Sequence, residues 1–409
     1  MNTYAILILL ALVLEYLLHL TADLLNLKAL EPELPGDFRD VYNAERYRRS
    51  QEYEWANTRF GLIPTSFNLV VLLAFWFAGG FQWLDATVRG FELNAILSGL
   101  SFIGTLLAAK FLLKLPFRWY QTFAIEERFG FNKTTPKTFW LDTLKSVFLG
   151  VLLSAPLLAG ILWLFETAGS MAWAWCWLLT TTFTLVIQFV APTWIMPMFN
   201  KFTPLDEGEL REAVMDYAKE VSFPLEGLFV IDGSRRSTKA NAFFTGFGKR
   251  KRVALFDTLI EKQSTDELVA IVAHEIGHYK CGHIRKNLAI GILQVGIIFF
   301  LLSIFLSHHG LYDAFFIHEM STYTGLVFFG MLFSPIDLLL SFFAQAFSRK
   351  NEFEADTFAR ETTGMGEHLI TALKHLAADS LQNLTPHPLY VKLHYSHPPL
   401  IKRIEALRD

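Results

Sequence analysis

The chain has 409 residues, of which 52% are hydrophobic and only 18% are charged. Soluble domains are typically about 25% charged, so this composition excludes a disordered protein and argues against an ordinary soluble enzyme. The formal net charge of −3 provides no general positive field, and we expect no nucleic-acid partner. Two cysteines are too few for a disulfide framework.

Seven apolar stretches are long enough to cross a bilayer as helices, which takes about 20 residues each. We predict the spans at 3–22, 61–83, 95–117, 144–165, 172–196, 288–307 and 322–347. The seventh is interrupted by Ser334, Pro335 and Asp337, which predicts a kink or a polar cavity at that point.

Lys and Arg residues are distributed very unevenly between these spans. Thirty-one lie in the segments 21–58, 118–142, 198–286 and 348–409, whereas Arg89 is the only one in the alternate segments. Cytoplasmic loops carry an excess of Lys and Arg. We therefore expect the long loop and the tail to face the cytoplasm and the N-terminus to lie outside.

The same pattern divides the chain into four parts. We predict spans one to five in 1–197, a cytoplasmic part in 198–286, spans six and seven in 287–347, and a second cytoplasmic part in 348–409. The two cytoplasmic parts are charged and amphipathic like soluble protein, so we expect them to pack together as one domain.

The strongest functional signal is the sequence His274-Glu275-Ile276-Gly277-His278. Apolar residues around it predict a helix over 266–286, with Ser264 or Thr265 as its N-cap. Residues four apart share a helix face, so His274 and His278 can bind one metal ion, and Glu275 can accept a proton from activated water. A plain amphipathic helix with surface histidines is the alternative. His283 lies off the paired face and is not expected to be a ligand.

A catalytic zinc typically has three protein ligands and one open position. The candidate for the third is in Asn351-Glu352-Phe353-Glu354-Ala355-Asp356, which follows the seventh span on the same side of the membrane. We expect Glu352 to bind the metal and Asp356 to hydrogen-bond a ligating histidine. Glu354 points away from Glu352 and is expected outside the ligand set. A charged helix start after a membrane exit is the alternative.

A β-hairpin is predicted over 237–256, with strand residues on both sides of a basic turn at Lys249–Arg252. An extended peptide can add to the edge of such a strand through backbone hydrogen bonds. This makes the strand that begins with Asn241, Ala242, Phe243 and Phe244 a candidate substrate-binding segment, with a purely structural hairpin as the alternative. The basic run is expected to follow the charge rule for cytoplasmic loops or to contact anionic lipid.

The tail contains His394-Tyr395-Ser396-His397-Pro398-Pro399, and Arg403 follows six residues after His397. A histidine beside a zinc site can donate to the oxyanion that forms at a scissile carbonyl. Without a metal site nearby, His397 would be an ordinary loop histidine.

These motifs together resemble the Ste24 family of integral-membrane zinc metalloproteases, the type I CAAX prenyl proteases of the M48 clan. The resemblance covers nearly the whole chain. Besides the two metal motifs it rests on Ile125–Asn132, Pro197–Leu205, Asn241–Phe247, Leu255–Leu259 and His394–Leu400.

The resemblance implies a mostly α-helical membrane protein whose seven helices form a barrel around a large chamber, capped by a zinc domain with a small sheet. It implies one Zn²⁺ per chain, with His274, His278 and Glu352 as ligands and Glu275 as the general base. It also implies that Asp356 contacts a ligating histidine without binding the metal itself. Asn241, His397 and Arg403 would line the site and contact the substrate or the oxyanion.

Members of this family remove the last three residues from proteins that end in a prenylated Cys-a-a-X sequence. The resemblance therefore implies a prenylated or membrane-associated substrate, and a monomer. The compact chain with short outer loops and no ER-retrieval tail indicates a bacterial member in the cytoplasmic membrane; a eukaryotic member would lie in the ER membrane. A cell without protein prenylation would leave quality control of membrane proteins as the alternative role. A transporter with a metal gate and an inactive scaffold are further alternatives.

Overall fold

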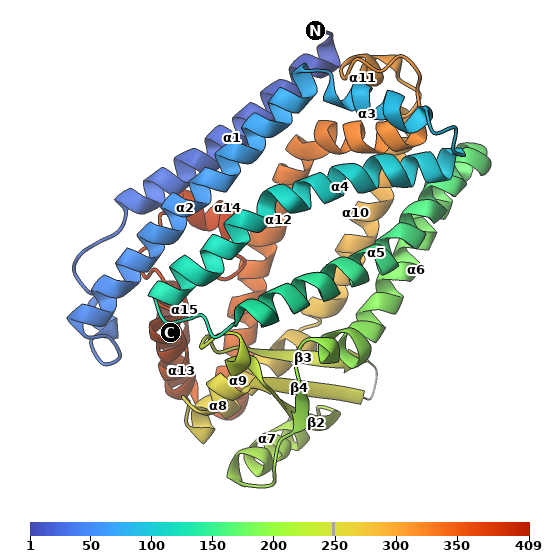
Figure 1. Cartoon of the computed structure of the whole chain (residues 1–409). Helices are drawn as coiled ribbons and strands as arrows, with labels where there is room; N and C mark the ends of the chain where they lie inside the picture. Colours follow the sequence, from blue (N-terminus) through green and yellow to red (C-terminus); the bar gives the residue numbers. More distant parts are fainter. Residues whose placement is uncertain (248–249) are drawn as a thin grey trace.

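The computed structural model describes residues 1–247 and 250–409, so Lys249 of the predicted basic turn lies outside the described residues. Figure 1 shows a long bundle of helices with a small sheet at one end. The α-helices are α1 (Thr3–Lys28), α2 (Ala44–Phe77), α3 (Gly80–Arg89), α4 (Ala95–Tyr120), α5 (Pro136–Thr167), α6 (Ala172–Val190), α7 (Glu209–Glu220), α8 (Asp257–Ile260), α9 (Thr265–Lys280), α10 (His283–Phe305), α11 (His309–Asp313), α12 (Thr322–Thr363), α13 (Gly366–Asp379), α14 (Pro388–His394) and α15 (Leu400–Arg408).

Seven helices in the described part of the chain are long and apolar enough to cross a membrane, which confirms the predicted number of spans. Several extend well beyond the predicted ends: α2 begins at Ala44, and α12 continues to Thr363. The predicted end of the second span at residue 83 is wrong, because α2 ends at Phe77. Gly79 follows with a φ of +75°, which glycine adopts readily, and this turn separates α2 from α3.

Five of the membrane helices form a closed circuit of neighbours. α4 contacts α5, α5 contacts α6, α6 contacts α10, α10 contacts α12, and α12 returns to α4, while α1 lies between α2 and α12. This is the arrangement expected of a barrel, although the chamber inside it stays a prediction. The ribbon of α12 changes direction along its length (Figure 1), and Pro335, which cannot donate a helical hydrogen bond, lies inside it.

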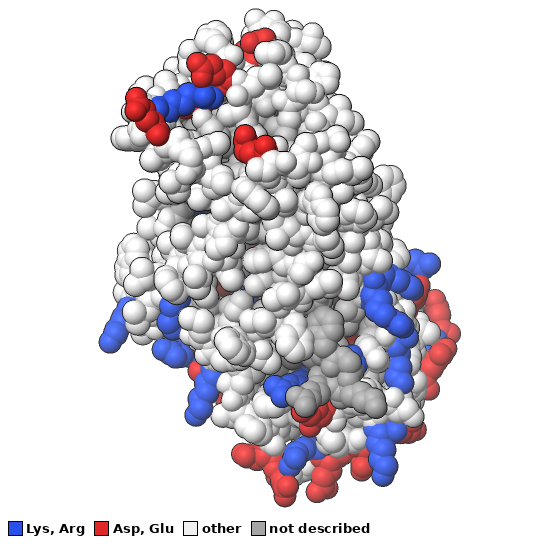
Figure 2. Space-filling model, turned by 90° about the vertical axis from the view of Figure 1, so that its right-hand side faces the viewer, with Lys and Arg blue, Asp and Glu red and all other residues white. Residues whose placement is uncertain are grey.

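The surface has a broad uncharged belt. On the face in Figure 2, Lys and Arg gather at the end that carries the sheet, and the middle is almost free of charged residues. Large apolar side chains are exposed along the membrane helices, among them Leu14, Val70, Leu112, Leu144, Phe189 and Leu339. Apolar side chains at such positions are what a lipid-facing surface requires.

The sheet has four strands: β1 (Phe202–Pro204), β2 (Leu225–Ile231), β3 (Ala242–Phe247) and β4 (Arg250–Phe256). Their order is β1-β2-β4-β3, with β2 and β4 parallel and the other two pairs antiparallel. The predicted hairpin is therefore confirmed as β3 and β4. However, Arg250, Lys251 and Arg252 belong to strand β4 and not to the turn, because each pairs with a residue of β3.

The end of the molecule that carries the sheet has its own apolar core. It joins residues from 214–276 with residues from 359–407, and the short segment around Phe38 and Tyr42 packs against both. The two predicted cytoplasmic parts thus pack as one body. The predicted boundaries at 286 and 347 lie within α10 and α12, which continue through them without a break.

The predicted helix over 266–286 consists of two helices. Ser264 is the N-cap of α9, as expected, and forms a capping box with Glu267. α9 ends at Lys280, and Gly282 has a φ of +74°, which turns the chain before α10 begins at His283.

Candidate metal centre and active site

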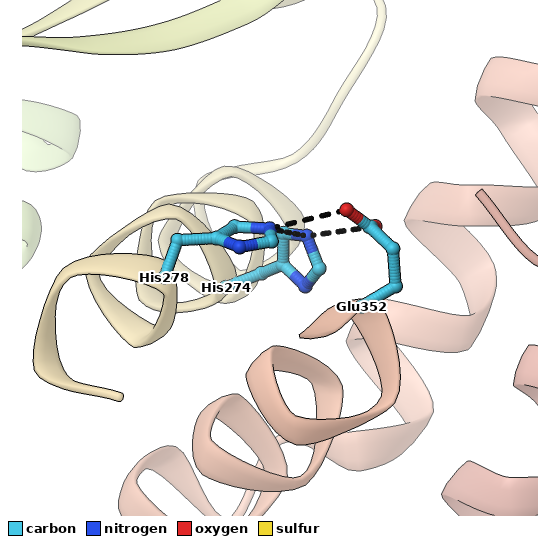
Figure 3. Close-up of side chains that lie close together, drawn as sticks. All are labelled: His274, His278 and Glu352. Atoms are coloured by element: carbon cyan, nitrogen blue, oxygen red, sulfur yellow. Dashed lines mark hydrogen bonds and ion pairs between the residues drawn. The ribbon is translucent and has the colours of Figure 1, made fainter. Parts of the chain in front are cut away.

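His274, His278 and Glu352 converge on one point between α9 and α12 (Figure 3). The Nε2 atoms of the two histidines lie 3.2 Å apart. Nε2 of His274 lies 3.4 Å from Oε2 of Glu352, and Nε2 of His278 lies 3.3 Å from Oε1. The two histidines are one helical turn apart on α9, so the sequence spacing alone places them on the same face.

These donors fit a zinc ion. Ligand atoms about 2.0–2.1 Å from a tetrahedral zinc lie about 3.3 Å from one another, which matches the separation of the two Nε2 atoms and the distance from each of them to one oxygen of Glu352. The carboxylate of Glu352 is buried, and its Oε2 accepts no hydrogen bond from the described residues. A buried carboxylate oxygen without a hydrogen bond is costly, and a cation at this point would satisfy it.

Asp356 holds the ring of His274 from behind. Its Oδ1 lies 2.8 Å from Nδ1 of His274, which favours a proton on Nδ1 and leaves Nε2 free to bind a metal, although the two groups do not align as a hydrogen bond. Burial lowers the pKa of His274, but Asp356 and Glu352 outweigh this effect and raise the pKa to about 9. A metal ion at Nε2 therefore competes with a proton.

Arg403 anchors Asp356. Its Nε and Nη2 donate to the two carboxylate oxygens of Asp356 at 2.8 and 2.6 Å, and its Nη1 lies 3.5 Å from Oε2 of Glu352. Arg403 is 7% exposed. This two-point contact connects α15 to α12 behind the candidate ligands.

Glu275 on α9 and His397 in the loop between α14 and α15 line the same cavity, which has a volume of about 140 Å³. Burial raises the pKa of Glu275, and the neighbouring His274 and His278 oppose this. Nε2 of His397 lies 3.4 Å from Oε1 of Glu352, and its Nδ1 lies 2.8 Å from the hydroxyl of Ser396. His397 is also exposed, which leaves it accessible to a substrate.

The candidate substrate strand contributes only its first residues to the cavity. Asn241 and Ala242 line it. Phe244 instead packs against Phe223 and Tyr279, and Phe243 lies against Phe256 on the other face of the sheet. β3 is an edge strand, and among the described residues no strand pairs with its outer side, where an additional strand could add.

The cavity also has an apolar wall that the sequence motifs did not indicate. It is formed by Leu259, Ile271, Leu369, Leu373 and Leu376. The three leucines of α13 follow a helical spacing, but this spacing is equally typical of a helix that only faces the core. A second cavity of about 480 Å³ shares part of this wall and also His397 and Arg403.

The helical architecture and this group of side chains fit the class of integral-membrane metallopeptidases. Comparison with known families agrees. Residues 23–201 match a family model described as "CAAX prenyl protease N-terminal, five membrane helices", and residues 204–409 match peptidase family M48.

Individual relatives match over most of their length. The chain is 34% identical to the CAAX prenyl protease 1 homolog of Oryza sativa over 97% of this chain and 95% of the relative. It is 34% identical to CAAX prenyl protease 1 of Saccharomyces cerevisiae over 93% and 89%. The crystal structure of S. mikatae Ste24p covers 100% of both chains with a TM-score of 0.94 and 31% identity. The chain therefore belongs to peptidase family M48 and, within it, to the CAAX prenyl protease 1 or Ste24 family.

This result confirms the predicted family, fold class and enzyme class. The relatives reported above are eukaryotic proteins, so they do not support the expectation of a bacterial source. Membership of a peptidase family also favours hydrolysis over the transporter and scaffold hypotheses.

Proposed function

We propose that this protein is a zinc metalloendopeptidase that cleaves peptide bonds near the C-terminus of prenylated Cys-a-a-X substrates. The observation that carries the proposal is the convergence of His274, His278 and Glu352 at mutual separations of 3.2–3.4 Å. The names of the relatives, which are CAAX prenyl proteases, support the substrate class.

In this proposal the two imidazoles and the carboxylate would hold one zinc ion. A zinc ion bound there would supply Lewis acidity, which makes water nucleophilic near neutral pH and polarises a carbonyl group. Asp356 keeps the proton of His274 on Nδ1, and the geometry holds Glu352 between the two rings.

Glu275 is the proposed general base. It takes a proton from the attacking water onto its carboxylate and then delivers this proton to the leaving amine. The raised pKa of Glu275 suits this exchange, because a carboxylate that holds a proton more firmly is the better base.

His397 is the proposed donor to the oxyanion, because it is exposed at the cavity and lies close to Glu352. Arg403 has a different proposed role from the one expected from the sequence. Since two of its nitrogens already bond Asp356, we propose that it positions Asp356 and thereby His274, and that its remaining nitrogen keeps the carboxylate of Glu352 in place.

The substrate is proposed to lie extended along the outer edge of β3, next to Asn241 and Ala242. Backbone hydrogen bonds would fix its register. The apolar wall of Leu369, Leu373 and Leu376 would then contact aliphatic side chains of the substrate.

The proposed orientation places the metal centre and the C-terminus on the cytoplasmic side and the N-terminus outside, because Lys and Arg gather at the end of the molecule with the sheet. The protein is proposed to act as a monomer surrounded by lipid, in the ER membrane of a eukaryote or the cytoplasmic membrane of a bacterium. In sealed vesicles, protease added to the cytoplasmic side should remove a tag placed after residue 409 and spare one placed before residue 1. The opposite result would reverse the orientation.

The substrate proposal is tested by mass spectrometry of the products from farnesylated and unmodified Cys-a-a-X peptides. Chelator-sensitive release of the last three residues, faster from the farnesylated peptide, is expected. Equal cleavage of both peptides would favour a role on non-prenylated membrane proteins. Cleavage that a zinc chelator does not affect would contradict the metal mechanism.

A further inference from the structure

We propose that His283 and Glu354 form a relay behind the second histidine of the metal site and fix the ring of His278 in the tautomer that binds metal. Neither residue belongs to the candidate ligand set. The inference rests on the metal site proposed above and adds two positioning residues to it.

The relay is a chain of three side chains. Nδ1 of His278 lies 3.0 Å from Nδ1 of His283, and Nε2 of His283 lies 3.1 Å from Oε2 of Glu354. Both distances are those of hydrogen bonds. His283 is almost completely buried, with 1% of its surface exposed, so water does not replace these partners.

One arrangement of protons satisfies the whole chain with neutral rings. If Nε2 of His278 binds the metal, its proton must be on Nδ1, from which it donates to Nδ1 of His283. This nitrogen then carries no proton, so the proton of His283 is on Nε2 and is donated to Glu354. A neutral imidazole has one donor and one acceptor, and here each donor faces an acceptor.

The two candidate histidine ligands are therefore supported in parallel ways. A carboxylate stands directly behind His274, and a second carboxylate stands behind His278 with one imidazole between them. α12 supplies the acidic group in both cases, and it also supplies Glu352. Ligating histidines typically donate their other ring nitrogen to such a group, which orients the ring and raises its basicity.

The turn between α9 and α10 places His283 within reach. Gly282 has a φ of +74°, a conformation that side-chain-bearing residues rarely adopt, and α10 begins at the next residue. The chain therefore turns shortly after the metal motif, and the first residue of α10 lies against the last histidine of α9.

A second metal ion is the competing explanation, because ligand atoms of Cys281, His283 and Glu354 lie within 4.8 Å of one another. The relay is favoured because both ring nitrogens of His283 already face partners. The test below separates the two explanations.

The experiment measures the zinc affinity of the full-length protein in detergent by competition with a chelator of known affinity. His283→Leu and Glu354→Ala are each expected to weaken zinc binding by about 10–100-fold. The double variant should bind zinc no more weakly than the weaker-binding single variant, since both changes interrupt the same relay. His283→Gln should recover part of the affinity, because an amide can accept from His278 and donate to Glu354.

Two control variants accompany these. Lys350→Ala removes the ion pair of Glu354 with Lys350 at 3.6 Å but leaves the relay intact, so its zinc affinity should equal that of the unchanged protein. Cys281→Ser should bind zinc with the same stoichiometry and affinity. If His283→Leu does not fold, Glu354→Ala carries the test, because the side chain of Glu354 is 37% exposed.

The relay would be refuted if folded Glu354→Ala bound zinc as tightly as the unchanged protein, or if His283→Gln were as weak as His283→Leu. A second zinc per chain that disappears in Cys281→Ser would refute it in favour of a second metal site. Absence of zinc binding in the unchanged protein would instead contradict the proposed function.

Discussion

Replacement of Asp356 by Asn tests the support behind the metal site. The carboxylate accepts two hydrogen bonds from Arg403 and lies 2.8 Å from Nδ1 of His274. An Asn amide has one acceptor oxygen and one donor nitrogen. With its oxygen in the place of Oδ1 it turns an N–H group toward Nε of Arg403, and with its oxygen in the place of Oδ2 it turns an N–H group toward both His274 and Nη2 of Arg403.

Two effects follow from this mismatch. Loss of the group behind a ligating histidine typically weakens metal binding by about 10–100-fold, which equals about 1.4–2.8 kcal/mol. Arg403 is 7% exposed, and loss of one partner of a buried ion pair costs about 3–5 kcal/mol of stability. Because Asn keeps part of the bonding, the lower end of that range is expected.

The assay combines zinc affinity, by chelator competition, with the melting temperature of the metal-free protein. Asp142→Asn is the matched control, because Asp142 also accepts two bonds from one arginine, Arg236, at 2.8 and 3.1 Å. The control should lose melting temperature and keep its zinc affinity, whereas Asp356→Asn should lose both. Unchanged zinc affinity in folded Asp356→Asn would refute the support that we assign to Asp356.

Three further predictions concern the active site. Glu275→Gln should retain zinc, as measured by metal analysis, while kcat falls by about 10²–10⁴-fold; loss of the zinc together with the activity would contradict its role as a base. His397→Ala should lower kcat by about 10²–10³-fold with little change in zinc affinity, and an effect confined to KM would contradict its role at the oxyanion. Gly277→Ala should lower the melting temperature by an amount equal to about 1–3 kcal/mol, because its new Cβ would lie 3.1 Å from the backbone oxygen of Ala355 on α12; an unchanged melting temperature would show that α9 and α12 can separate.

The metal motifs could be recognised from the sequence because their geometry is local. His274 and His278 share a face of one helix through their spacing alone, and the same holds for Glu352 and Asp356 on α12. The charge asymmetry and the seven apolar stretches likewise depend on composition, so the number of spans was confirmed. The structure adds that the two helices pack together.

Contacts between distant segments could not be predicted in this way. Arg403 bonds Asp356 across 47 residues, and no periodicity links the two. The family resemblance implies a contact of Arg403 with the substrate or the oxyanion, whereas in the structure two of its nitrogens bond the carboxylate of Asp356. In a continuous helix His283 would lie off the face of His278, so the sequence indicates no contact between the two rings. The turn at Gly282 breaks that helix and changes the position of His283.

The ends of the membrane helices could not be predicted accurately, for a different reason. A hydropathy window detects the apolar part of a helix and not its polar extensions. The first turns of α2 and the last turns of α12 are polar. The helices continue through them because these turns pack against the end of the molecule that carries the sheet.

His274, His278 and Glu352 are proposed to hold one metal ion, and the rest of the proposed mechanism depends on it. The most direct measurement is the zinc content per chain of the purified full-length protein and of its His278→Ala and Glu352→Ala variants. About one zinc per chain is expected in the unchanged protein, and a strong loss of zinc is expected in both folded variants. Zinc at the same stoichiometry and affinity in both variants would contradict it.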